Sequence, residues 1–359
     1  MSRHAGSEPT KILILGVNGF IGNALVERIL ETTDWEVWGM DLANTKLGGS
    51  LASARFHFIE GDLLIHKEWV EYHIKKCDVV IPLVAIATPA AYVARPLEVF
   101  ELDFEENLRI VRLCVRYRKR VVFPSTSEVY GKCPDESFSE DTSDLVYGPI
   151  CKTRWIYAAS KQLLDRVIAA YGEQGLRYTC FRPFNWVGPK LDDIHAAKEG
   201  SSRVATQFIA NLLMGEPLRI VDGGAQRRCY TWIGDGIDGL MAILEDAGKR
   251  CNGEVINLGN PANDCSVAEL ADQLASLYVE RREKVPNFVP PTIEAISSAE
   301  YYGSGYEDIT SRKPDIGKAR SLLDWSPRLG LRETLARTFD AFLAEALAAT
   351  GQGIAARAE

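Results

Sequence analysis

The chain has 359 residues, of which 46% are hydrophobic and 25% are charged. This composition is ordinary for a soluble globular protein, and the length suffices for one large core or two adjoining lobes. The 41 lysines and arginines are outnumbered by 49 aspartates and glutamates, which gives a net charge of −8. No basic run indicates a nucleic-acid partner, so an anionic ligand would need a local cluster of arginines.

The eight cysteines show no CxxC spacing, and the N-terminus has no signal-peptide pattern. We therefore expect reduced thiols in a cytoplasmic protein, without disulfides and without a metal site. The longest apolar stretch, residues 79–91, contains two prolines and is too short to span a membrane. No membrane partner is expected.

The N-terminal part of the chain has the pattern of a dinucleotide-binding unit. An apolar strand over residues 11–15 leads into GVNGFIG at 16–22, followed by a helix over 24–30 and a strand over 36–40 that ends at Asp41. The glycines allow a tight turn, close approach of a pyrophosphate, and packing of the helix against the strand. An acid in this position accepts ribose hydroxyls and repels a 2′-phosphate, which favours NAD over NADP. The expected cofactor contacts here are Gly16, Gly19, Phe20, Ile21, Gly22 and Asp41.

Further apolar strands follow at the spacing of a Rossmann-type, doubly wound parallel sheet. They are predicted over residues 55–60, 78–84, 120–124 and 176–182. A long helix is predicted over 99–116. Asp62, after the first of these strands, either approaches the adenine or caps the next turn. We count Asp62 and its neighbour Leu63 among the cofactor-binding residues.

Tyr157 and Lys161 lie in an apolar-periodic run over residues 155–168 that predicts a helix. Residues four apart share a helix face, and an ammonium close to a phenol favours the phenolate. We therefore expect Lys161 to lower the pKa of Tyr157 below its ordinary value near 10, so that Tyr157 acts as a general base for a sugar or alcohol hydroxyl. YxxxK by itself is also compatible with an ordinary amphipathic helix. The hydroxyl-rich segment 125–128 follows a strand at the sheet edge where ligands bind, which favours the catalytic interpretation.

Beyond residue 182 the alternation of strands and helices breaks, which predicts a smaller C-terminal lobe for a substrate. Ser266, with Glu269 three residues later, predicts a capped helix start. The other expected segments are a loop over 183–189, helices over 204–214, 233–244, 267–279 and 331–348, a strand over 254–258, and a loop over 297–316.

These predictions divide the chain into two lobes. The NAD-binding Rossmann lobe covers residues 1–182, with return segments at about 229–260. The substrate lobe covers residues 183–228 and 261–345, and an Ala-rich tail covers 346–359. Residues 1–10 are small or polar and are expected to be disordered.

The order of these motifs resembles that of the extended short-chain dehydrogenases/reductases. GxxGxxG, the acid at residue 41, the hydroxyls at 125–127 and YxxxK all occur in the family's order. More narrowly, residues 10 to about 345 are similar to the dehydrogenase/decarboxylase half of the bifunctional aminoarabinose enzymes of polymyxin resistance. This similarity is carried by residues 16–23, 83–89, 100–108, 124–131, 154–157 and 182–186.

The resemblance implies an NAD-dependent oxidative decarboxylation of UDP-glucuronate to a UDP-4-keto-pentose, CO2 and NADH. The catalytic residues it implies are Tyr157, Lys161, Thr126, Ser127, Glu128 as proton acceptor and Arg312 as proton donor. The substrate-binding positions it implies are Ala87, Tyr92, Thr126, Ser127, Arg154, Asn185, Arg203, Arg219, Arg228 and Tyr306. It further implies a homodimer or higher homo-oligomer, paired through the helices around 99–116 and 155–171. Only about ten residues precede the first strand, so we expect the formyltransferase half to be absent.

Several alternatives remain open at this point. Arg219 and Arg228 could be surface charges, although their place beyond residue 182 favours a diphosphate clamp. An arginine is a poor acid at neutral pH, so we expect Arg312 chiefly to anchor a carboxylate, and Glu128 could orient a water or act through its charge. The alternative enzymes are UDP-xylose and UDP-apiose/xylose synthases, which return the hydride to the product. An epimerase or a dehydratase fits the residues less well. The alternative of another class is a non-catalytic, NAD-sensing regulator.

Overall fold

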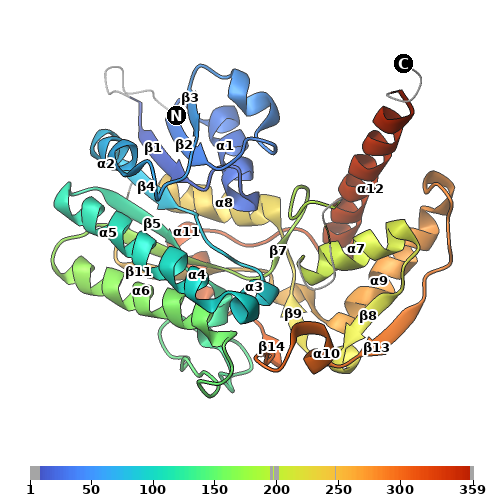
Figure 1. Cartoon of the computed structure of the whole chain (residues 1–359). Coiled ribbons are helices and arrows are strands. Elements are labelled where there is room, and N and C mark those ends of the chain that lie inside the picture. Colours follow the sequence, from blue (N-terminus) through green and yellow to red (C-terminus); the bar gives the residue numbers. More distant parts are fainter. Residues whose placement is uncertain (1–8, 195–196, 198–201, 247, 356–359) are drawn as a thin grey trace.

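A parallel sheet with helices on both faces forms the centre of the molecule, as the computed structural model in Figure 1 shows. The structure describes residues 9–194, 197, 202–246 and 248–355, so most of the predicted disordered leader lies outside the described residues. The sheet has seven strands in the order β11-β6-β5-β4-β1-β2-β3. They are β1 Lys11–Leu15, β2 Glu36–Asp41, β3 Phe56–Glu60, β4 Val79–Pro82, β5 Arg120–Pro124, β6 Tyr178–Pro183 and β11 Glu254–Leu258.

All neighbouring strands of this sheet run parallel. The chain leaves β1 toward β2 and β3 on one side, and β4, β5, β6 and β11 lie on the other side. The strand order thus reverses between β1 and β4, which opens a crevice at their carboxyl ends. The predicted Rossmann-type, doubly wound sheet is confirmed.

Successive side chains of a strand point to opposite faces of the sheet, and β1 is apolar on both. Ile12 and Ile14 lie in the same apolar cluster as α1 (Phe20–Thr32), α8 (Ile233–Leu244) and α11 (Gly317–Leu323). Leu13 and Leu15 lie in the cluster formed with α2 (Lys67–Lys76), α5 (Asn107–Arg116) and α6 (Trp155–Glu173). The continuous apolar run of β1 is therefore explained by burial on both sides.

The prediction of one continuous α-helix over residues 99–116 is wrong, because a π-helical segment interrupts it. The structure has α3 Pro89–Ala94, α4 Pro96–Phe100, a π-helical segment over Glu101–Glu106, and only then α5. In a π-helical turn the backbone bonds reach one residue further than in an α-helix. The Asn107 side chain donates to Val84 O at 3.2 Å and to Leu102 O at 3.0 Å, which ties this wider turn to the segment after β4.

The C-terminal part of the chain contributes short sheets and longer helices. The additional strands are β7 Trp186–Val187, β8 Leu218–Val221, β9 Arg227–Cys229, β10 Thr231–Trp232, β12 Asp264–Ser266, β13 Ile293–Ile296 and β14 Ser311–Arg312. The additional helices are α7 Val204–Met214, α9 Val267–Glu280, α10 Ser298–Tyr302 and α12 Leu331–Ala355. The capping box of Ser266 and Glu269 at the start of α9 is confirmed.

Three predictions for this region are wrong. The predicted loop over 183–189 contains the short strand β7, which gains its regular pairing from β10. The predicted loop over 297–316 contains helix α10 and strand β14. Strand β14 gains its hydrogen bonds from β9, so the local sequence does not encode it. The register of this pair places Arg312 opposite Arg228. The last helix continues to Ala355 rather than ending at residue 348, so it takes up most of the predicted tail.

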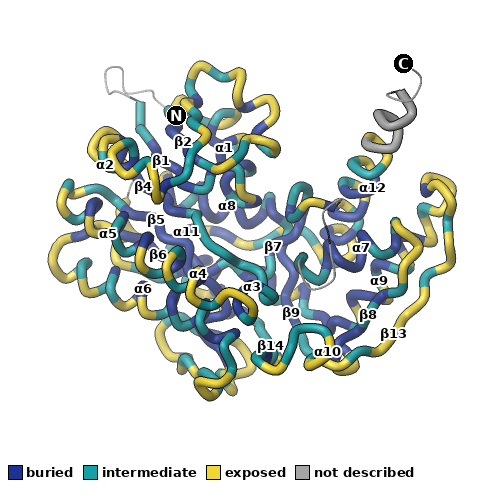
Figure 2. The backbone as a smooth tube through the Cα atoms, in the orientation of Figure 1, coloured by how far each residue is buried: buried dark blue, intermediate teal, exposed yellow. Residues whose placement is uncertain are grey.

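The sheet and the C-terminal segments share one apolar core. Ile12 of the sheet belongs to the same buried cluster as Leu270 of α9 and Phe339 of α12. Figure 2 shows the buried backbone running from the sheet through β7 and β9 toward α9. Among the described residues, no helix has both the length and the apolar character that a membrane crossing requires.

Phe339 tests whether α12 belongs to this core. We expect Phe339→Ala to lower the free energy of unfolding by about 3–5 kcal/mol, because it removes a fully buried ring. Leu347→Ala is the matched control on the same helix, since Leu347 is 37% exposed, and it should cost under about 1 kcal/mol. Urea unfolding of both variants measures the difference, and equal losses would show that α12 does not pack as described.

Candidate active site

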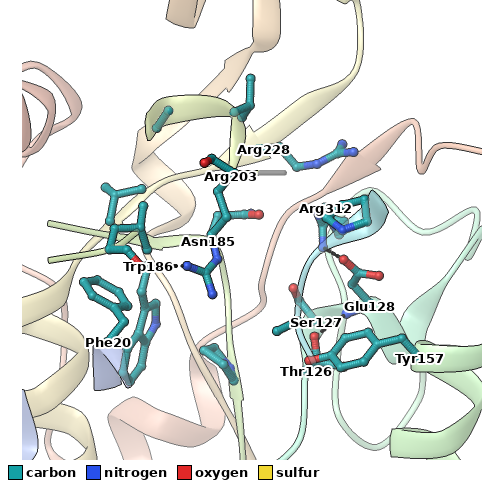
Figure 3. Close-up of a pocket in the computed structure, with 18 of the residues that line it drawn as sticks. Phe20, Thr126, Ser127, Glu128, Tyr157, Asn185, Trp186, Arg203, Arg228 and Arg312 are labelled. Atoms are coloured by element: carbon teal, nitrogen blue, oxygen red, sulfur yellow. Dashed lines mark hydrogen bonds and ion pairs between the residues drawn. The ribbon is translucent and has the colours of Figure 1, made fainter. Parts of the chain in front are cut away.

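A cavity of about 380 Å³ lies where the carboxyl ends of β1, β4 and β5 meet the C-terminal segments. Figure 3 shows that its side chains come from both parts of the chain, with Phe20 and Tyr157 on the sheet side and Arg203, Arg228 and Arg312 opposite. The predicted site residues that line it are Gly16, Gly19, Phe20, Ile21, Gly22, Ala87, Tyr92, Thr126, Ser127, Glu128, Arg154, Tyr157, Lys161, Asn185, Arg203, Arg219, Arg228, Tyr306 and Arg312.

The glycine turn forms one end of this cavity. Gly16 has a φ of +84°, and a Cβ there would lie 3.0 Å from the backbone of Leu83 and Val84. A Cβ on Gly22 would lie 2.6 Å from Gly16 O. Gly19, the residue before helix α1, is extended, and no side chain caps the first turn of the helix. Open backbone N–H groups at a helix N-terminus fit a diphosphate such as that of a dinucleotide.

Three predicted cofactor contacts lie outside the lining of the cavity. The Asp41 carboxylate accepts hydrogen bonds from Asn18 N at 2.7 Å and Leu42 N at 2.8 Å, so it braces the glycine turn. Burial raises the pKa of Asp41, against the effect of these hydrogen bonds. Asp62 caps its turn by accepting from Leu64 N at 2.8 Å, and Leu63 packs in the apolar core. Contacts of these three residues with a cofactor stay predictions.

Tyr157 and Lys161 share a face of α6 and both line the cavity, but the predicted lowering of the Tyr157 pKa is wrong for the chain alone. Burial raises the pKa of the Tyr157 phenol far above its ordinary value, and the charges of Asp103 and Glu128 act in the same direction. A hydrogen bond with Thr126 opposes them. The Lys161 ammonium lies 3.6 Å from Asp103 Oδ1, so a buried carboxylate offsets its charge.

Glu128 joins two arginines at the centre of the cavity. It lies in the short 3-10 turn over Ser127–Tyr130, and its N–H donates to Thr126 Oγ1 at 3.2 Å. Its Oε2 accepts from Arg154 Nη2 at 2.9 Å, and its Oε1 accepts from Arg312 Nη1 at 3.3 Å. Figure 3 shows Arg312 and Glu128 directed toward one another above Thr126 and Tyr157.

The buried guanidinium groups of the cavity have N–H donors that lack hydrogen-bond partners among the described residues. Among the described residues, Arg154 Nε and Nη1 and Arg312 Nε are buried without a hydrogen-bond partner. Burial lowers the pKa of Arg312, and the neighbouring charge of Arg228 lowers it further. Arg228 is bound to Asp308 at 2.6 Å and to Ile309 O at 2.7 Å. Buried polar donors are normally satisfied, so open arginine donors in a cavity favour an anionic ligand.

The remaining predicted contacts differ in burial. Arg203 pairs with Asp192 at 2.7 Å, and the 38% exposed Arg219 lies 3.7 Å from Glu294. Arg228 is buried, so its interpretation as a solvated surface charge is wrong. Asn185 lines the cavity with a φ of +40°, a left-handed conformation that asparagine adopts more readily than most residues.

The aromatic residues form two stacks at the cavity wall. Tyr92 stacks on Tyr157 with centroids 4.6 Å apart and an interplanar angle of 6°. Tyr306 stacks on Tyr302 at 4.1 Å. Tyr302 and Asp308 also line the cavity and Asp103 lies beside Lys161, although none of the three was among the predicted site residues. Asp103 is one of several acids in residues 101–106, so its sequence context gives no signal that sets it apart. Among the described residues, no group of three His, Cys, Asp or Glu side chains could hold a metal ion.

Residues 12–259 match the NAD dependent epimerase/dehydratase family. The chain belongs to this family. Its cofactor is NAD, and the glycine turn and the open start of α1 fit that group. The resemblance to extended short-chain dehydrogenases/reductases is confirmed.

Solved structures extend the likeness over nearly the whole chain. PbgP3 from Burkholderia pseudomallei is 50% identical, with 94% of this chain and 98% of that chain covered and a TM-score of 0.83. Pal from Bacillus thuringiensis is 26% identical, with 93% and 99% covered and a TM-score of 0.76. UDP-glucuronic acid 4-epimerase from Bacillus cereus, solved with UDP-glucuronic acid and NAD, shares the fold at 23% identity, 94% and 99% coverage and a TM-score of 0.76.

Gly22→Val tests the glycine turn. The new Cβ would meet the backbone oxygens of Gly16 and Val17 at 2.6 and 2.7 Å, so the turn must shift. We expect the dissociation constant for NAD, measured by calorimetry, to rise at least about 10-fold. Gly49→Val is the control, because a Cβ there meets nothing within 4 Å. Unchanged NAD affinity in Gly22→Val would contradict the assignment of this turn to the diphosphate.

Proposed function

We propose that this protein is an NAD-dependent UDP-glucuronate dehydrogenase (decarboxylating), which forms a UDP-4-keto-pentose, CO2 and NADH. The observation that carries the proposal is the group of Glu128, Arg154 and Arg312 beside Tyr157 in one cavity. A sugar bearing a carboxylate needs buried cations that a neutral hexose does not. The choice of UDP-glucuronate as the substrate rests on the similarity of residues 10 to about 345 to the decarboxylase half of the aminoarabinose enzymes.

Oxidation comes first in this proposal. Tyr157 accepts the proton of the sugar 4-hydroxyl, and Lys161 holds its position on the same face of α6. The glycine turn and the open start of α1 would hold NAD, which would supply a hydride acceptor for C4 and a positive charge that favours the Tyr157 phenolate. Thr126 hydrogen bonds with Tyr157 and keeps the phenol oriented toward the sugar.

Decarboxylation follows from the ketone. The C4 carbonyl is β to the C6 carboxylate, so the C5–C6 bond can break with loss of CO2 while the electron pair forms an enolate. The side chains of Thr126 and Ser127 line the cavity with Tyr157, and we assign to their hydroxyls the stabilisation of the enolate oxygen. C5 then takes a proton and the 4-keto-pentose is complete.

We assign two roles in the decarboxylation to Arg312: it binds the substrate carboxylate, and it donates a proton to C5. Its guanidinium anchors the substrate carboxylate while it donates to Glu128, and the backbone pairing of β14 with β9 fixes the strand that carries it. The lowered pKa of Arg312, caused first by burial and then by Arg228, moves it in the direction that proton donation to C5 requires. Glu128 holds Arg312 and Arg154 together and provides a carboxylate that can accept a proton.

The same cavity also fits a synthase that returns the hydride to the product. Lys46 Nζ donates to Lys190 O at 2.8 Å, and Lys190 Nζ donates to Lys46 O at 2.9 Å. This reciprocal bridge joins the segment after β2 to a segment whose Leu191 lines the cavity. The bridge between Lys46 and Lys190 would slow the release of NADH. An enzyme that keeps its NADH can return the hydride to the product, as UDP-xylose and UDP-apiose/xylose synthases do.

We also propose a homodimer that pairs through α5 and α6, as the resemblance implies. Leu97 of α4 is 71% exposed and Leu163 of α6 is 45% exposed, so apolar side chains are available on α4 and α6. Helices that expose apolar residues in a soluble enzyme are a common site of two-fold pairing.

Turnover of UDP-glucuronate tests the proposed function. With excess NAD and substrate, we expect absorbance of NADH to rise together with release of CO2 in a 1:1 ratio. Tyr157→Phe should lower the rate about 10²- to 10⁴-fold, because the proton acceptor is lost. Tyr72→Phe is the control, since Tyr72 is 61% exposed and outside the cavity. CO2 with no NADH would identify the synthase, and neither product would contradict both.

A further inference from the structure

Asp103 is a buried carboxylate that the proposed mechanism does not use. It lies in the π-helical segment Glu101–Glu106, and its side chain is fully buried. π-Helical turns are rare in proteins, and those that occur often lie at functional sites. The wider turn moves a side chain out of the position that it would have in an α-helix. The position of Asp103 in this turn is therefore a first indication that its placement matters.

The two oxygens of Asp103 face different parts of the cavity wall. Oδ2 accepts from Ile86 N at 3.0 Å, and Ile86 lies between Ala85 and Ala87, which both line the cavity. Oδ1 lies 3.6 Å from Lys161 Nζ and is buried without a hydrogen-bond partner among the described residues. One carboxylate thus holds the segment after β4 and faces the ammonium beside Tyr157.

The charges around Lys161 come from several elements. The ammonium donates to Pro124 O at 3.2 Å and lies over the ring of Phe123 at 4.9 Å. Asp165 of α6 also acts on it, but Arg182 at 3.1 Å and the hydroxyl of Ser125 at 2.6 Å already engage that carboxylate. Asp103 is therefore the anion that balances Lys161 directly.

The charges around Tyr157 are equally mixed. Asp103 from the π-helical segment and Glu128 from the turn after β5 both raise its pKa, and Thr126 and Arg203 lower it. Tyr92 of α3 contributes a stacked, neutral ring. Removal of the Asp103 charge would take away one of the two anions that raise the pKa of Tyr157 and would weaken the balance of the Lys161 charge, so the phenol would lose its proton at lower pH.

We propose that Asp103 is a positioning residue for the Tyr157–Lys161 pair, and that its negative charge raises the pH at which Tyr157 becomes able to accept a proton. It keeps the phenol protonated while the cavity lacks a further cation, and it fixes the ammonium against β5. This inference rests on the proposed function for its kinetic test, but its central interaction can be measured without substrate.

The kinetic test is the pH dependence of single-turnover NAD reduction with UDP-glucuronate. Asp103→Asn keeps an acceptor for Ile86 N and removes the charge, so we expect the midpoint of the acid limb to fall by about one pH unit. Asp103→Glu keeps the charge and should keep the midpoint. Glu105→Gln removes an exposed charge from the same segment and is the matched control. A purely structural role would lower the rate equally at every pH, and an unchanged midpoint in Asp103→Asn would overturn the proposal.

The second test needs no substrate and no folded Asp103→Asn protein. In protein labelled with ¹³C at its aspartate carboxyls, the Asp103 resonance is identified by its loss in Asp103→Glu. Burial raises the pKa of Asp103 to about 6, and Lys161 opposes that rise. We expect the titration midpoint to move upward by at least one pH unit in Lys161→Met. An unchanged midpoint would overturn the pairing, whatever the outcome of the turnover assay.

Discussion

A single buried carboxylate, Glu128, holds two arginines that reach it from separate segments of the chain. Arg154 stands just before α6, and Arg312 is in β14, 184 residues from Glu128 in sequence. An isolated buried charge is costly in free energy, so these groups are stable only when they meet. The cavity between the sheet and the C-terminal segments is therefore tied to the formation of this cluster, and the substrate would enter a set of charges that the fold has already assembled.

The segment that carries Arg312 is fixed by backbone bonds on both sides. Ser311–Arg312 pairs with β9, and the following Lys313 O accepts from Phe138 N at 2.8 Å. Phe138 O in turn accepts from Asp315 N at 2.9 Å. These bonds connect β14 to the loop after β5, so the strand that delivers Glu128 and the strand that delivers Arg312 are positioned together.

A second polar network lies beneath the catalytic edge of the sheet. Ser125, next to Thr126, donates to Asp165, which also binds Arg182. Arg182 Nη1 donates to Tyr130 OH at 2.8 Å, and Tyr130 donates to Asn257 of β11 at 2.9 Å. The network links three neighbouring strands and α6, so the geometry at Tyr157 depends on the central sheet as well as on its own helix.

The sequence predicted those features that local patterns encode. The strands of the sheet, the glycine turn and the capping box of Ser266 follow from periodicity and from residues a few positions apart. The π-helical turn at Asp103 and the strand β14 depend on partners far along the chain, so propensity could not find them. The pairing of Glu128 with Arg312 was approached only through family resemblance.

The raised pKa of Tyr157 shows why the chemistry was harder to predict than the fold. The spacing of Tyr157 and Lys161 was right, and both line the cavity. The sign of the pKa shift was wrong, because it is set by burial and by Asp103, which a four-residue spacing does not contain. The YxxxK motif correctly located Tyr157 and Lys161, but the residues around Tyr157 decide whether its phenol is protonated.

The proposed chemistry depends most directly on the coupling between Glu128 and Arg312. A double-mutant cycle of Glu128→Gln, Arg312→Gln and the double variant, with kcat/KM for UDP-glucuronate as the readout, measures that coupling. If the two residues act as one unit, the double variant should lose no more activity than the worse single variant, to within about threefold. If the losses of the two single variants multiply in the double variant, Glu128 and Arg312 act independently and the account is contradicted.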